Sequence, residues 1–286
     1  MKKHLFVINP VSGGAQKDML IAEIEKLFHK YSIRIIKTTG LEDAERLKKE
    51  IQDFNPDIVN IGGGDGTINK LALTVSNAGK TMGIIPSGSA NGLATDLGID
   101  INNALDCIKS TKTIDLDIVM INNHPMIHMA DLGLNAALIR RYEQEERRGL
   151  LGYAVSAFKE LSAVNDLFEA LVTTDNTTLR LLTSFLVIAN SKQYGTGYEI
   201  NPNGQLDDQQ FEICAMKELS VDNVFQNLFN PENAGRTNGI FDSHSYTEAA
   251  IKLQKATDFQ IDGEYMGKVN ELSIKVHSNQ IKLLIP

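Results

Sequence analysis

The sequence of 286 residues has no tryptophan, two cysteines and no apolar run long enough to cross a bilayer. Cys107 and Cys214 lie far apart, without a CxxC pair or a histidine at metal-binding spacing. This pattern argues against structural zinc and is typical of a reducing compartment, and neither cysteine is a good candidate nucleophile. The first residues, MKKHLFVINP, are too short in their apolar part for a secretory signal. We therefore expect a cytoplasmic protein without a transmembrane segment.

Positive charge is also scarce, since 28 lysines and arginines face 36 acidic residues, which gives a formal net charge of −8. Binding to nucleic acid by counterion release requires a basic face, and no stripe of basic and aromatic residues occurs here. Four arginines, at 140, 141, 147 and 148, are interrupted by glutamates and are interpreted as a solvated helix face. The composition therefore excludes a nucleic-acid partner.

The first 120 residues alternate between short apolar runs and amphipathic stretches. The expected strands are HLFVINP, SIRIIKTT, PDIVNI and TMGIIP, and the expected helices are KDMLIAEIEKLFHKY, EDAERLKKEIQDF and TINKLALTVSNAG. Alternation of strands and helices predicts a largely parallel sheet covered on both faces. We expect a Rossmann-like α/β domain over residues 1–122.

From about residue 115 the pattern becomes rich in strands. TIDLDIVMINNHPMIHMADLG reads as strands joined at Asn122-Asn123, and a long helix is expected over about 136–164. Short apolar runs separated by turn residues then continue to the end, which is typical of an antiparallel β-sandwich. The second predicted domain therefore covers residues 123–286, and a return of the last strand, IKLLIP, to the first domain is left open.

Three glycine-rich stretches each follow an expected strand: NPVSGG at 9–14, GGGDGT at 62–67 and PSGSANG at 86–92. Because ligands of open α/β sheets gather beyond the carboxyl ends of the strands, we expect the three loops to meet at one edge. Glycine permits a close approach of backbone amides to phosphate. The three loops together predict a phosphate-binding site.

Asp65 places a carboxylate among amides that would bind phosphate. It would repel an anion unless a cation or a hydroxyl lies between them, which is the arrangement that phosphoryl transfer requires. Thr67 supplies a hydroxyl and a cap for the following helix. The sequence has no GxxxxGK[ST] loop and no GxGxxG dinucleotide motif.

NPVSGG, GGGDGT and GIIPSGSANGLA in this order resemble the catalytic domain of the diacylglycerol kinase and sphingosine kinase superfamily, especially the soluble bacterial lipid kinases. ADLGLNAALIR, RRGLLGY, IANSKQYGTGYEINPNGQLDD and FQIDGE are similar to later motifs of that superfamily. The resemblance extends over nearly the whole chain. GGDGT alone is shared with NAD kinases.

The resemblance implies a two-domain protein with ATP between an α/β domain and a β-sandwich, and it implies roles for individual residues. Glu264 matches the proton acceptor, with Asp262 beside it, and the two are expected to share one face of a strand. A purely structural DG turn between two strands stays open as the alternative. Asp65 is the third candidate catalytic residue. The residues implied to bind the nucleotide are Asn9, Pro10, Ser12, Gly13, Thr38, Gly63, Gly64, Asp65, Gly66, Thr67, Ser89 and Asn91.

The resemblance also implies a structural Mg²⁺ bound by a loop that reads roughly LDDGLLD in some bacterial members and LDDQQFE here. Asp208 matches the carboxylate ligand, and Gln205 and Gln210 match positions that contribute backbone carbonyls. The glycine of that loop is missing. A second departure is Gly92, which replaces an aspartate found where bacterial diacylglycerol kinases read GTxND.

The predicted function is an ATP- and Mg²⁺-dependent lipid kinase that phosphorylates a hydroxyl of a diacylglycerol-like or sphingoid-like acceptor. Two alternatives stay open: an NAD kinase-like enzyme, and a catalytically weak member that binds nucleotide or lipid. The expected partner is a lipid substrate at a membrane surface, with peripheral membrane contact. A homodimer is also left open.

Overall fold

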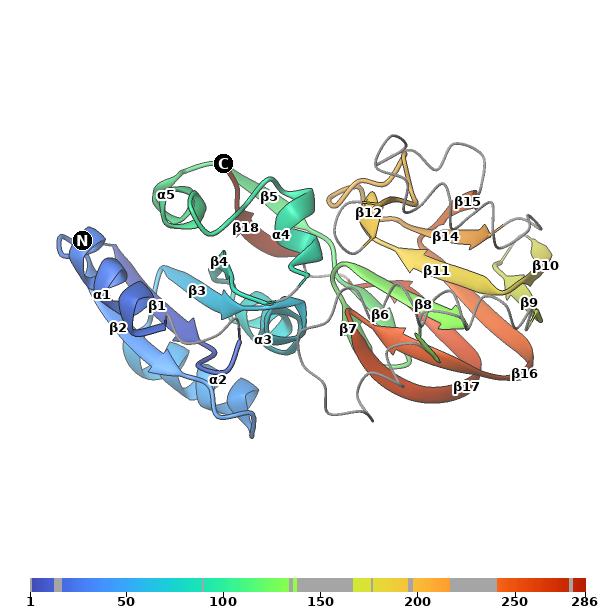
Figure 1. The fold of residues 1–286 in the computed structure, drawn as a ribbon, viewed down its shortest axis with the longest axis horizontal. Coiled ribbons are helices and arrows are strands. Elements are labelled where there is room, and N and C mark those ends of the chain that lie inside the picture. Colours follow the sequence, from blue (N-terminus) through green and yellow to red (C-terminus); the bar gives the residue numbers. More distant parts are fainter. Residues whose placement is uncertain are drawn as a thin grey trace. The chain divides into compact units, whose positions relative to one another are not determined.

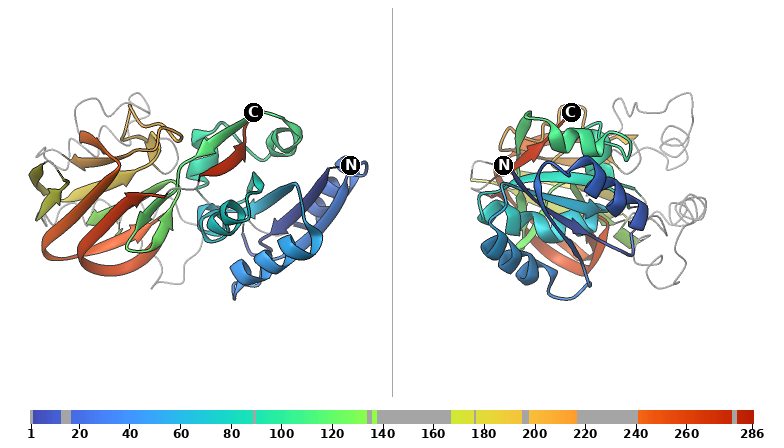
Figure 2. Two further views of the ribbon diagram at one scale, coloured as in Figure 1. Left: turned by 180° about the vertical axis from the view of Figure 1, so that it is seen from behind. Right: turned by 90° about the vertical axis from the view of Figure 1, so that its left-hand side faces the viewer.

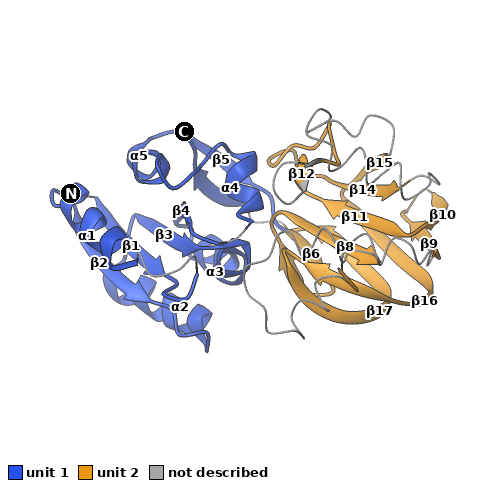
Figure 3. Cartoon of the chain, viewed as in Figure 1, with its two compact units in different colours: residues 1–118, 278–286 blue, residues 119–277 orange. Residues whose placement is uncertain are grey.

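The computed structural model describes residues 2–12, 17–88, 90–133, 136–137, 167–175, 177–194, 198–216, 241–277 and 280–286. They form two compact units, Met1–Ile118 with Ser278–Pro286 as unit 1 and Val119–His277 as unit 2 (Figure 3). The helix expected over 136–164 falls outside the described residues except at 136–137, as do the four arginines. No helix in the described part of the chain is long and apolar enough to cross a membrane.

Unit 1 contains a six-stranded sheet in the order β2-β1-β3-β4-β18-β5 (Figure 1). The strands are β1 (Lys3–Ile8), β2 (Ser32–Lys37), β3 (Ile58–Gly63), β4 (Thr81–Pro86), β5 (Thr113–Leu116) and β18 (Ile281–Leu284). Neighbouring strands are parallel except for β5, which runs antiparallel to β18. The predicted parallel sheet is confirmed, and every residue of β3 is buried, as expected of a strand with both faces covered.

The helices of unit 1 are α1 (Lys17–Leu27), α2 (Asp43–Phe54), α3 (Asp65–Asn77), α4 (Gly92–Asp96) and α5 (Ala104–Lys109). Their apolar residues recur at helical spacing, so each helix buries one face. In α3 the buried apolar residues are Ile68, Leu71, Ala72 and Val75. Helices α2 and α3 lie side by side (Figure 1, Figure 2). Asn55 ends α2 in a left-handed conformation, with its amide donating to the carbonyl of Ile51.

Unit 2 is built on a ten-stranded antiparallel sheet among the described residues. Its main path runs β15-β14-β11-β8-β16-β17-β6-β7, and the β9–β10 pair joins it through β16. The strands are β6 (Val119–Ile121), β7 (His124–Met126), β8 (Met129–Gly133), β9 (Phe168–Thr173), β10 (Thr178–Thr183), β11 (Phe185–Ala189), β14 (Phe211–Met216), β15 (Phe241–Tyr246), β16 (Glu248–Ile261) and β17 (Glu264–Val276). A separate pair comprises β12 (Gln193–Tyr194) and β13 (Tyr198–Glu199). The predicted change to an antiparallel β domain is confirmed.

Two-residue turns join consecutive strands of unit 2. Asn122 and Asn123, between β6 and β7, have φ values of 48° and 69°. Asp262 and Gly263, between β16 and β17, have φ values of 46° and 84°. Positive φ at both central residues is typical of the hairpin turn whose twist matches the flanking strands, and Asn and Asp-Gly are the residues that tolerate it. The expected Asn122-Asn123 turn is confirmed.

Candidate functional site

The three glycine-rich loops of unit 1 meet at the carboxyl edge of the parallel sheet. The amide of Asn9, after β1, donates to the carbonyl of Gly62 at 2.8 Å, and the amide of Ser87, after β4, donates to the carbonyl of Gly63 at 2.9 Å. These hydrogen bonds extend the ladders of β1–β3 and β3–β4 into the loops. The meeting of the three loops, expected from the strand order alone, is confirmed.

Side chains then link the loops in pairs. The amide nitrogen Nδ2 of Asn9 donates to the hydroxyl of Thr67 at 2.8 Å, which joins the first loop to the start of α3. The hydroxyls of Ser12 and Ser87 lie 3.1 Å apart, which joins the first loop to the third. Within the third loop, the Oδ1 of Asn91 accepts the amide of Gly88 at 2.7 Å. Hydroxyl and amide groups from three segments therefore share one network.

The second and third loops also approach each other through glycine. A Cβ placed on Gly88 would lie 2.5 Å from the Cα of Gly64, and one placed on Gly64 would lie 3.0 Å from the Cα of Gly88. Real side chains do not tolerate such a distance to backbone. The two loops can therefore lie this close only because neither residue has a side chain, which answers why the sequence uses glycine here.

Asp65 begins α3, and its carboxylate reaches the start of α4. Its Oδ2 accepts the amide of Gly92 at 2.9 Å, and its Oδ1 accepts the amide of Leu93 at 3.3 Å. The first amides of a helix have no partner within the helix, so an acceptor from another segment satisfies them. Asp65 is thus fixed by the backbone of the third loop, and the half-exposed carboxylate lies where the loops converge.

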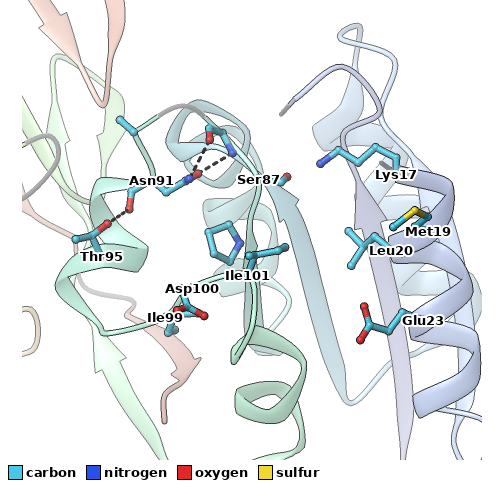
Figure 4. Close-up of a pocket in the computed structure, with 13 residues that line it drawn as sticks. Lys17, Met19, Leu20, Glu23, Ser87, Asn91, Thr95, Ile99, Asp100 and Ile101 are labelled. Atoms are coloured by element: carbon cyan, nitrogen blue, oxygen red, sulfur yellow. Dashed lines mark hydrogen bonds between the residues drawn. The ribbon is translucent and has the colours of Figure 1, made fainter. Parts of the chain in front are cut away.

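A pocket of about 440 Å³ in unit 1 adjoins these loops (Figure 4). Ser87 and Asn91 line it on the loop side, while Lys17 and Leu20 of α1 line the opposite side. Lys17 is the single cationic side chain among the described residues that line the pocket. Partial burial lowers the pKa of its ammonium group below the ordinary value. The pocket therefore combines polar loop groups with one cation, the carboxylates of Glu23 and Asp100, and apolar side chains of α1.

The remaining predicted nucleotide-binding residues are less informative. Thr38 follows β2, and its amide donates to the carbonyl of Ile8 at 3.0 Å, so it lies beside the end of β1. Pro10 is exposed in the first loop. Gly66 lies in the first turn of α3, and no atom lies within 4 Å of the position that a Cβ would occupy there, so the space beside it is open. Gly13 and Ser89 lie outside the described residues.

In unit 2, the two carboxylates of the sequence IDGE do not share a face. Asp262 occupies the turn itself, is 7 % exposed, and accepts three backbone amides at 2.9 to 3.0 Å, those of Ile127, His128 and Met129. Glu264 begins β17 and is exposed. The expectation of two carboxylates side by side on a strand is wrong, because Asp262-Gly263 forms the hairpin turn and breaks the strand periodicity between them.

Comparison with known families covers both units. Residues 3–121 match the diacylglycerol kinase catalytic domain. Residues 128–285 match the YegS C-terminal NAD kinase beta sandwich-like domain, and this match alone spans more than half of the chain. The chain belongs to the YegS-like and diacylglycerol kinase family of lipid kinases. Members of this lipid kinase family are phosphotransferases.

Individual relatives agree with this membership. A "Probable lipid kinase YegS-like" of Klebsiella pneumoniae is 29% identical over 232 residues, which cover 78% of this chain and 76% of the relative. A "Diacylglycerol kinase" of Bacillus subtilis is 25% identical over 280 residues, which cover 93% and 91%. A crystal structure of a diacylglycerol kinase from Bacillus anthracis has a TM-score of 0.76 at 16% identity and covers 100% of this chain and 97% of its own, so it shows the same lipid kinase fold.

The loop predicted to hold a structural Mg²⁺ in this lipid kinase keeps a tight turn. Gln209 adopts a φ of 60°, a left-handed conformation that glycine takes up without strain, and Asp208 accepts the amide of Gln210 at 3.0 Å. The carboxylate of Asp208 and the backbone carbonyls of Gln205 and Gln210 are oxygen ligands of the kind that Mg²⁺ prefers, so they fit such an ion in chemical type. The described residues contain no group of three or more His, Cys, Asp or Glu side chains that could hold a metal ion. The metal site stays a prediction.

The structure adds Lys17, which the sequence patterns did not single out, to the candidate site, and it also places there Ser87, one of the donors expected in the PSGSANG loop. Ser87 bonds to Ser12, and Lys17 faces the pocket. Ser87 lies within the quoted PSGSANG loop, so the loop motif contained the signal. Lys17 is separated from the first loop by two residues, and only its place in the first turn of α1, where amides favour anions, could have indicated it.

The cysteines of this lipid kinase agree with the expectation that neither is a nucleophile. Cys107 and Cys214 are free and buried. Burial raises the pKa of the Cys214 thiol to about 12 and also raises the pKa of the Cys107 thiol. Because the thiolate is the reactive form, both thiols are unreactive at neutral pH.

Proposed function

We propose that this lipid kinase transfers the γ-phosphate of ATP to a hydroxyl of a diacylglycerol-like or sphingoid-like lipid at a membrane surface. The observation that carries the proposal is the meeting of three glycine-rich loops around the fixed carboxylate of Asp65 at the carboxyl edge of the sheet of unit 1. Backbone amides and hydroxyls at such an edge suit phosphate groups. Lys17 adds a positive charge beside the same loops.

In the proposed reaction, the oxygen of the lipid hydroxyl forms a bond to the γ-phosphorus, and the bond from that phosphorus to the β–γ bridging oxygen breaks. ADP leaves with the electron pair of the broken bond, and a carboxylate accepts the hydroxyl proton. Mg²⁺ bound with ATP would neutralise charge on the β- and γ-phosphates. The glycine-rich loops hold the phosphates, and Asp65 holds a position at which it can contact the metal or the hydroxyl.

Glu264 is the proposed proton acceptor. Its exposed position at the start of β17 leaves the carboxylate accessible to a substrate, in contrast to buried Asp262. A general base must come within hydrogen-bond distance of the hydroxyl proton during transfer. The assignment therefore requires the β16–β17 turn to reach the acceptor hydroxyl when both substrates are bound.

A transfer assay with radiolabelled γ-phosphate tests the proposal against diacylglycerol, monoacylglycerol, phosphatidylglycerol, sphingoid bases and NAD in mixed micelles. We expect transfer to at least one lipid, and a loss of roughly 10²- to 10⁴-fold in kcat in the Glu264→Gln variant, the range of general base catalysis. Glu271→Gln is the matched control, because Glu271 is an exposed carboxylate farther along the same strand. Its kcat should stay within about twofold of the wild-type value.

Phosphorylation of NAD without phosphorylation of any lipid would show that the chain is an NAD kinase and overturn the proposed acceptor. Nucleotide binding without transfer to any of these compounds would identify a binding protein. Full activity of Glu264→Gln would move proton acceptance to Asp65.

A further inference from the structure

The turn between β16 and β17 is held by buried polar side chains on its inner side. Gln260, which is 2 % exposed, accepts the amide of Gly263 through Oε1 at 2.7 Å and donates through Nε2 to the buried carboxylate of Asp131. The side chain of Gln260 therefore bridges the turn to β8. This two-residue turn is therefore anchored to the interior of unit 2 by a side chain as well as by the pairing of its own strands.

Asp262 provides a second and stronger anchor. Its carboxylate accepts the amides of Ile127, His128 and Met129, and its own amide donates to the carbonyl of Met129 at 2.9 Å. A carboxylate offers about four acceptor positions, so three backbone amides occupy most of them. Taking up a proton would remove the negative charge that strengthens these three bonds inside the protein, where weakly satisfied amides are costly. Asp262 is thus arranged to bind backbone and not to accept a substrate proton.

The segment that Asp262 binds is itself fixed from the other side. The Nδ2 of Asn190, a fully buried residue, donates to the carbonyl of Ile127 at 3.0 Å, and the amide of Asn190 donates to the carbonyl of His128 at 3.0 Å. Asn190 follows β11, within the IANS motif. The turn, residues 127–129 and the end of β11 therefore form one hydrogen-bonded network of buried groups.

Glu264 is two residues from Asp262 and one from Gly263, and it pairs with Ile261 across the turn. Its backbone position is therefore set by the conformation of the turn. We propose that Asp262 is a positioning residue, whose buried carboxylate clamps the turn to residues 127–129 and so holds Glu264 in place to accept the proton, with Gln260 as a weaker second clamp. This proposal rests on the proposed function, because it assigns Asp262 a task in the same reaction.

A double-mutant cycle tests the role of Asp262. In Asp262→Asn, one of the backbone amides of residues 127–129 loses its carboxylate acceptor and faces the NH₂ group of the asparagine side chain instead. This loosens the turn. We expect kcat to fall by roughly 10- to 100-fold with the KM for ATP unchanged, the size of effect that a small misplacement of a catalytic group produces. In the Glu264→Gln background the same substitution should cause almost no further loss, since it acts only through Glu264.

The pH dependence of kcat gives a second readout. If Asp262 only positions Glu264, Asp262→Asn keeps the rise of kcat with pH that titration of the base produces, at a lower plateau, whereas Glu264→Gln removes that rise. Losses that multiply in the double variant, or loss of the pH dependence in Asp262→Asn alone, would overturn the positioning role and return Asp262 to the catalytic residues.

Hydrogen exchange tests the clamp without any assay of activity. The amides of residues 127–129 should exchange faster in Asp262→Asn than in the wild-type protein and at the wild-type rate in Glu264→Gln. Glu271→Gln is again the matched control, because Glu271 is an exposed carboxylate farther along β17. It should leave both this exchange and kcat within about twofold of wild type.

If Asp262→Asn does not fold, Gln260→Met is the second variant, because it removes the hydrogen bonds of the second clamp with little change in side-chain volume. It should cause a smaller loss of kcat than Asp262→Asn. In the Glu264→Gln background it should cause almost no further loss. Unchanged exchange and unchanged kcat in the folded variants would overturn this proposal while leaving the lipid kinase reaction intact. Absence of transfer by the wild-type protein would instead overturn the proposed function, and with it the catalytic role of the clamp.

Discussion

Each unit has one Asp-Gly pair whose aspartate carboxylate binds the backbone of another segment. The two carboxylates differ in their exposure and in the number of backbone amides that they accept. Asp65-Gly66 begins α3 in unit 1, and Asp65 is half-exposed with two amide bonds at 2.9 and 3.3 Å. Asp262-Gly263 forms a hairpin turn in unit 2, and Asp262 is buried with three amide bonds at 2.9 to 3.0 Å. Similar dipeptides therefore serve different purposes.

The difference lies in the exposure of each aspartate and in the number of amides that it accepts. Asp65 is half-exposed and satisfies the amides of Gly92 and Leu93, two buried residues at the start of a short helix. Asp262 satisfies three successive amides of buried residues, those of Ile127 and His128 between β7 and β8 and that of Met129 at the start of β8. A carboxylate with remaining acceptor positions and access to solvent can still contact a substrate or cation, whereas a buried one with three amide partners mainly stabilises the fold. We infer that Asp65 contacts a substrate or cation during the reaction, whereas Asp262 acts by stabilising the conformation of the turn.

Substitution of Asp65 should produce the largest effect on catalysis in this comparison. In Asp65→Asn the negative charge is lost and one of the two amides faces an NH₂ group, so we expect kcat to fall by roughly 10²- to 10³-fold. The free energy of unfolding should fall by only about 1 kcal/mol, because the group is half-exposed and its bonds are longer. Asp262→Asn should destabilise unit 2 more, by about 2 kcal/mol, with a smaller loss of kcat.

Transfer kinetics and urea unfolding of the two variants, measured side by side, check this contrast. Equal losses of kcat and of stability in both variants would show that the two aspartates have the same role and that their difference in burial does not determine it.

The glycine contact between the loops of unit 1 gives the next largest effect. In Gly88→Ala the new Cβ would lie 2.5 Å from the Cα of Gly64, so the second and third loops must move apart. We expect affinity for ATP to fall by roughly 10- to 50-fold, a loss of about 1.4 to 2.3 kcal/mol, as measured by calorimetric titration.

Gly79→Ala is the control for this prediction. Gly79 follows α3 with a φ of 62° and has no atom within 4 Å of its Cβ position, so alanine there causes backbone strain without a collision. Stability should decrease while ATP affinity stays at the wild-type value. An equal loss of affinity in both variants would mean that strain in unit 1, and not the contact between the loops, controls binding.

The sequence predicted the parts of the fold that depend on local periodicity. Strands β1 to β4 and helices α1 to α3 were expected from apolar spacing, and the meeting of the three loops followed from the rule that carboxyl ends share an edge. The Asn122-Asn123 turn was also expected, because asparagine tolerates the left-handed conformation. These features depend on residues close together in the chain.

Long-range contacts could not be predicted in this way. The bonds from Asp262 to residues 127–129 span more than 130 positions, and nothing in the local pattern of FQIDGE indicates which amides the carboxylate will meet. The expectation that Asp262 and Glu264 share a face treated the segment as a continuous strand, whereas Asp-Gly favoured a turn. The contact of Asp65 with Gly92 likewise depends on the tertiary approach of two loops.

Acidification should change the stability of the two units in opposite directions, and this is the smallest effect that we predict. His4 of β1 is 1 % exposed and packs against the rings of Phe6, Phe28 and Tyr31, and its Nε2 has no hydrogen-bond partner among the described residues. Burial, with a further contribution from nearby Lys2, lowers its pKa to about 4. Because the unfolded chain binds the proton near pH 6.5, unit 1 should lose stability as the pH falls from about 6.5 to about 4.

Glu212 of β14 gives unit 2 the opposite dependence. The residue is 4 % exposed, its carboxyl group accepts hydrogen bonds from Asn201 and Ser245, and burial raises its pKa above the ordinary value. A raised pKa contributes stability at low pH that is lost as the pH rises through that pKa, so acidification should stabilise unit 2 at this site. On acidification from about pH 7 to about pH 5, the free energy of unfolding of unit 1 should therefore decrease from its value at neutral pH. The contribution of Glu212 to the stability of unit 2 should change in the opposite direction.

Calorimetric melting near pH 7 and near pH 5, with limited proteolysis to identify which unit opens first, measures this response. His4→Gln should remove most of the acid sensitivity of unit 1, since glutamine does not titrate, and Glu212→Gln should leave that sensitivity unchanged while altering only the pH dependence of unit 2. Acid-induced opening that begins in unit 2, or persists undiminished in unit 1 of His4→Gln, would show that the buried histidine of β1 does not set the difference between the two units.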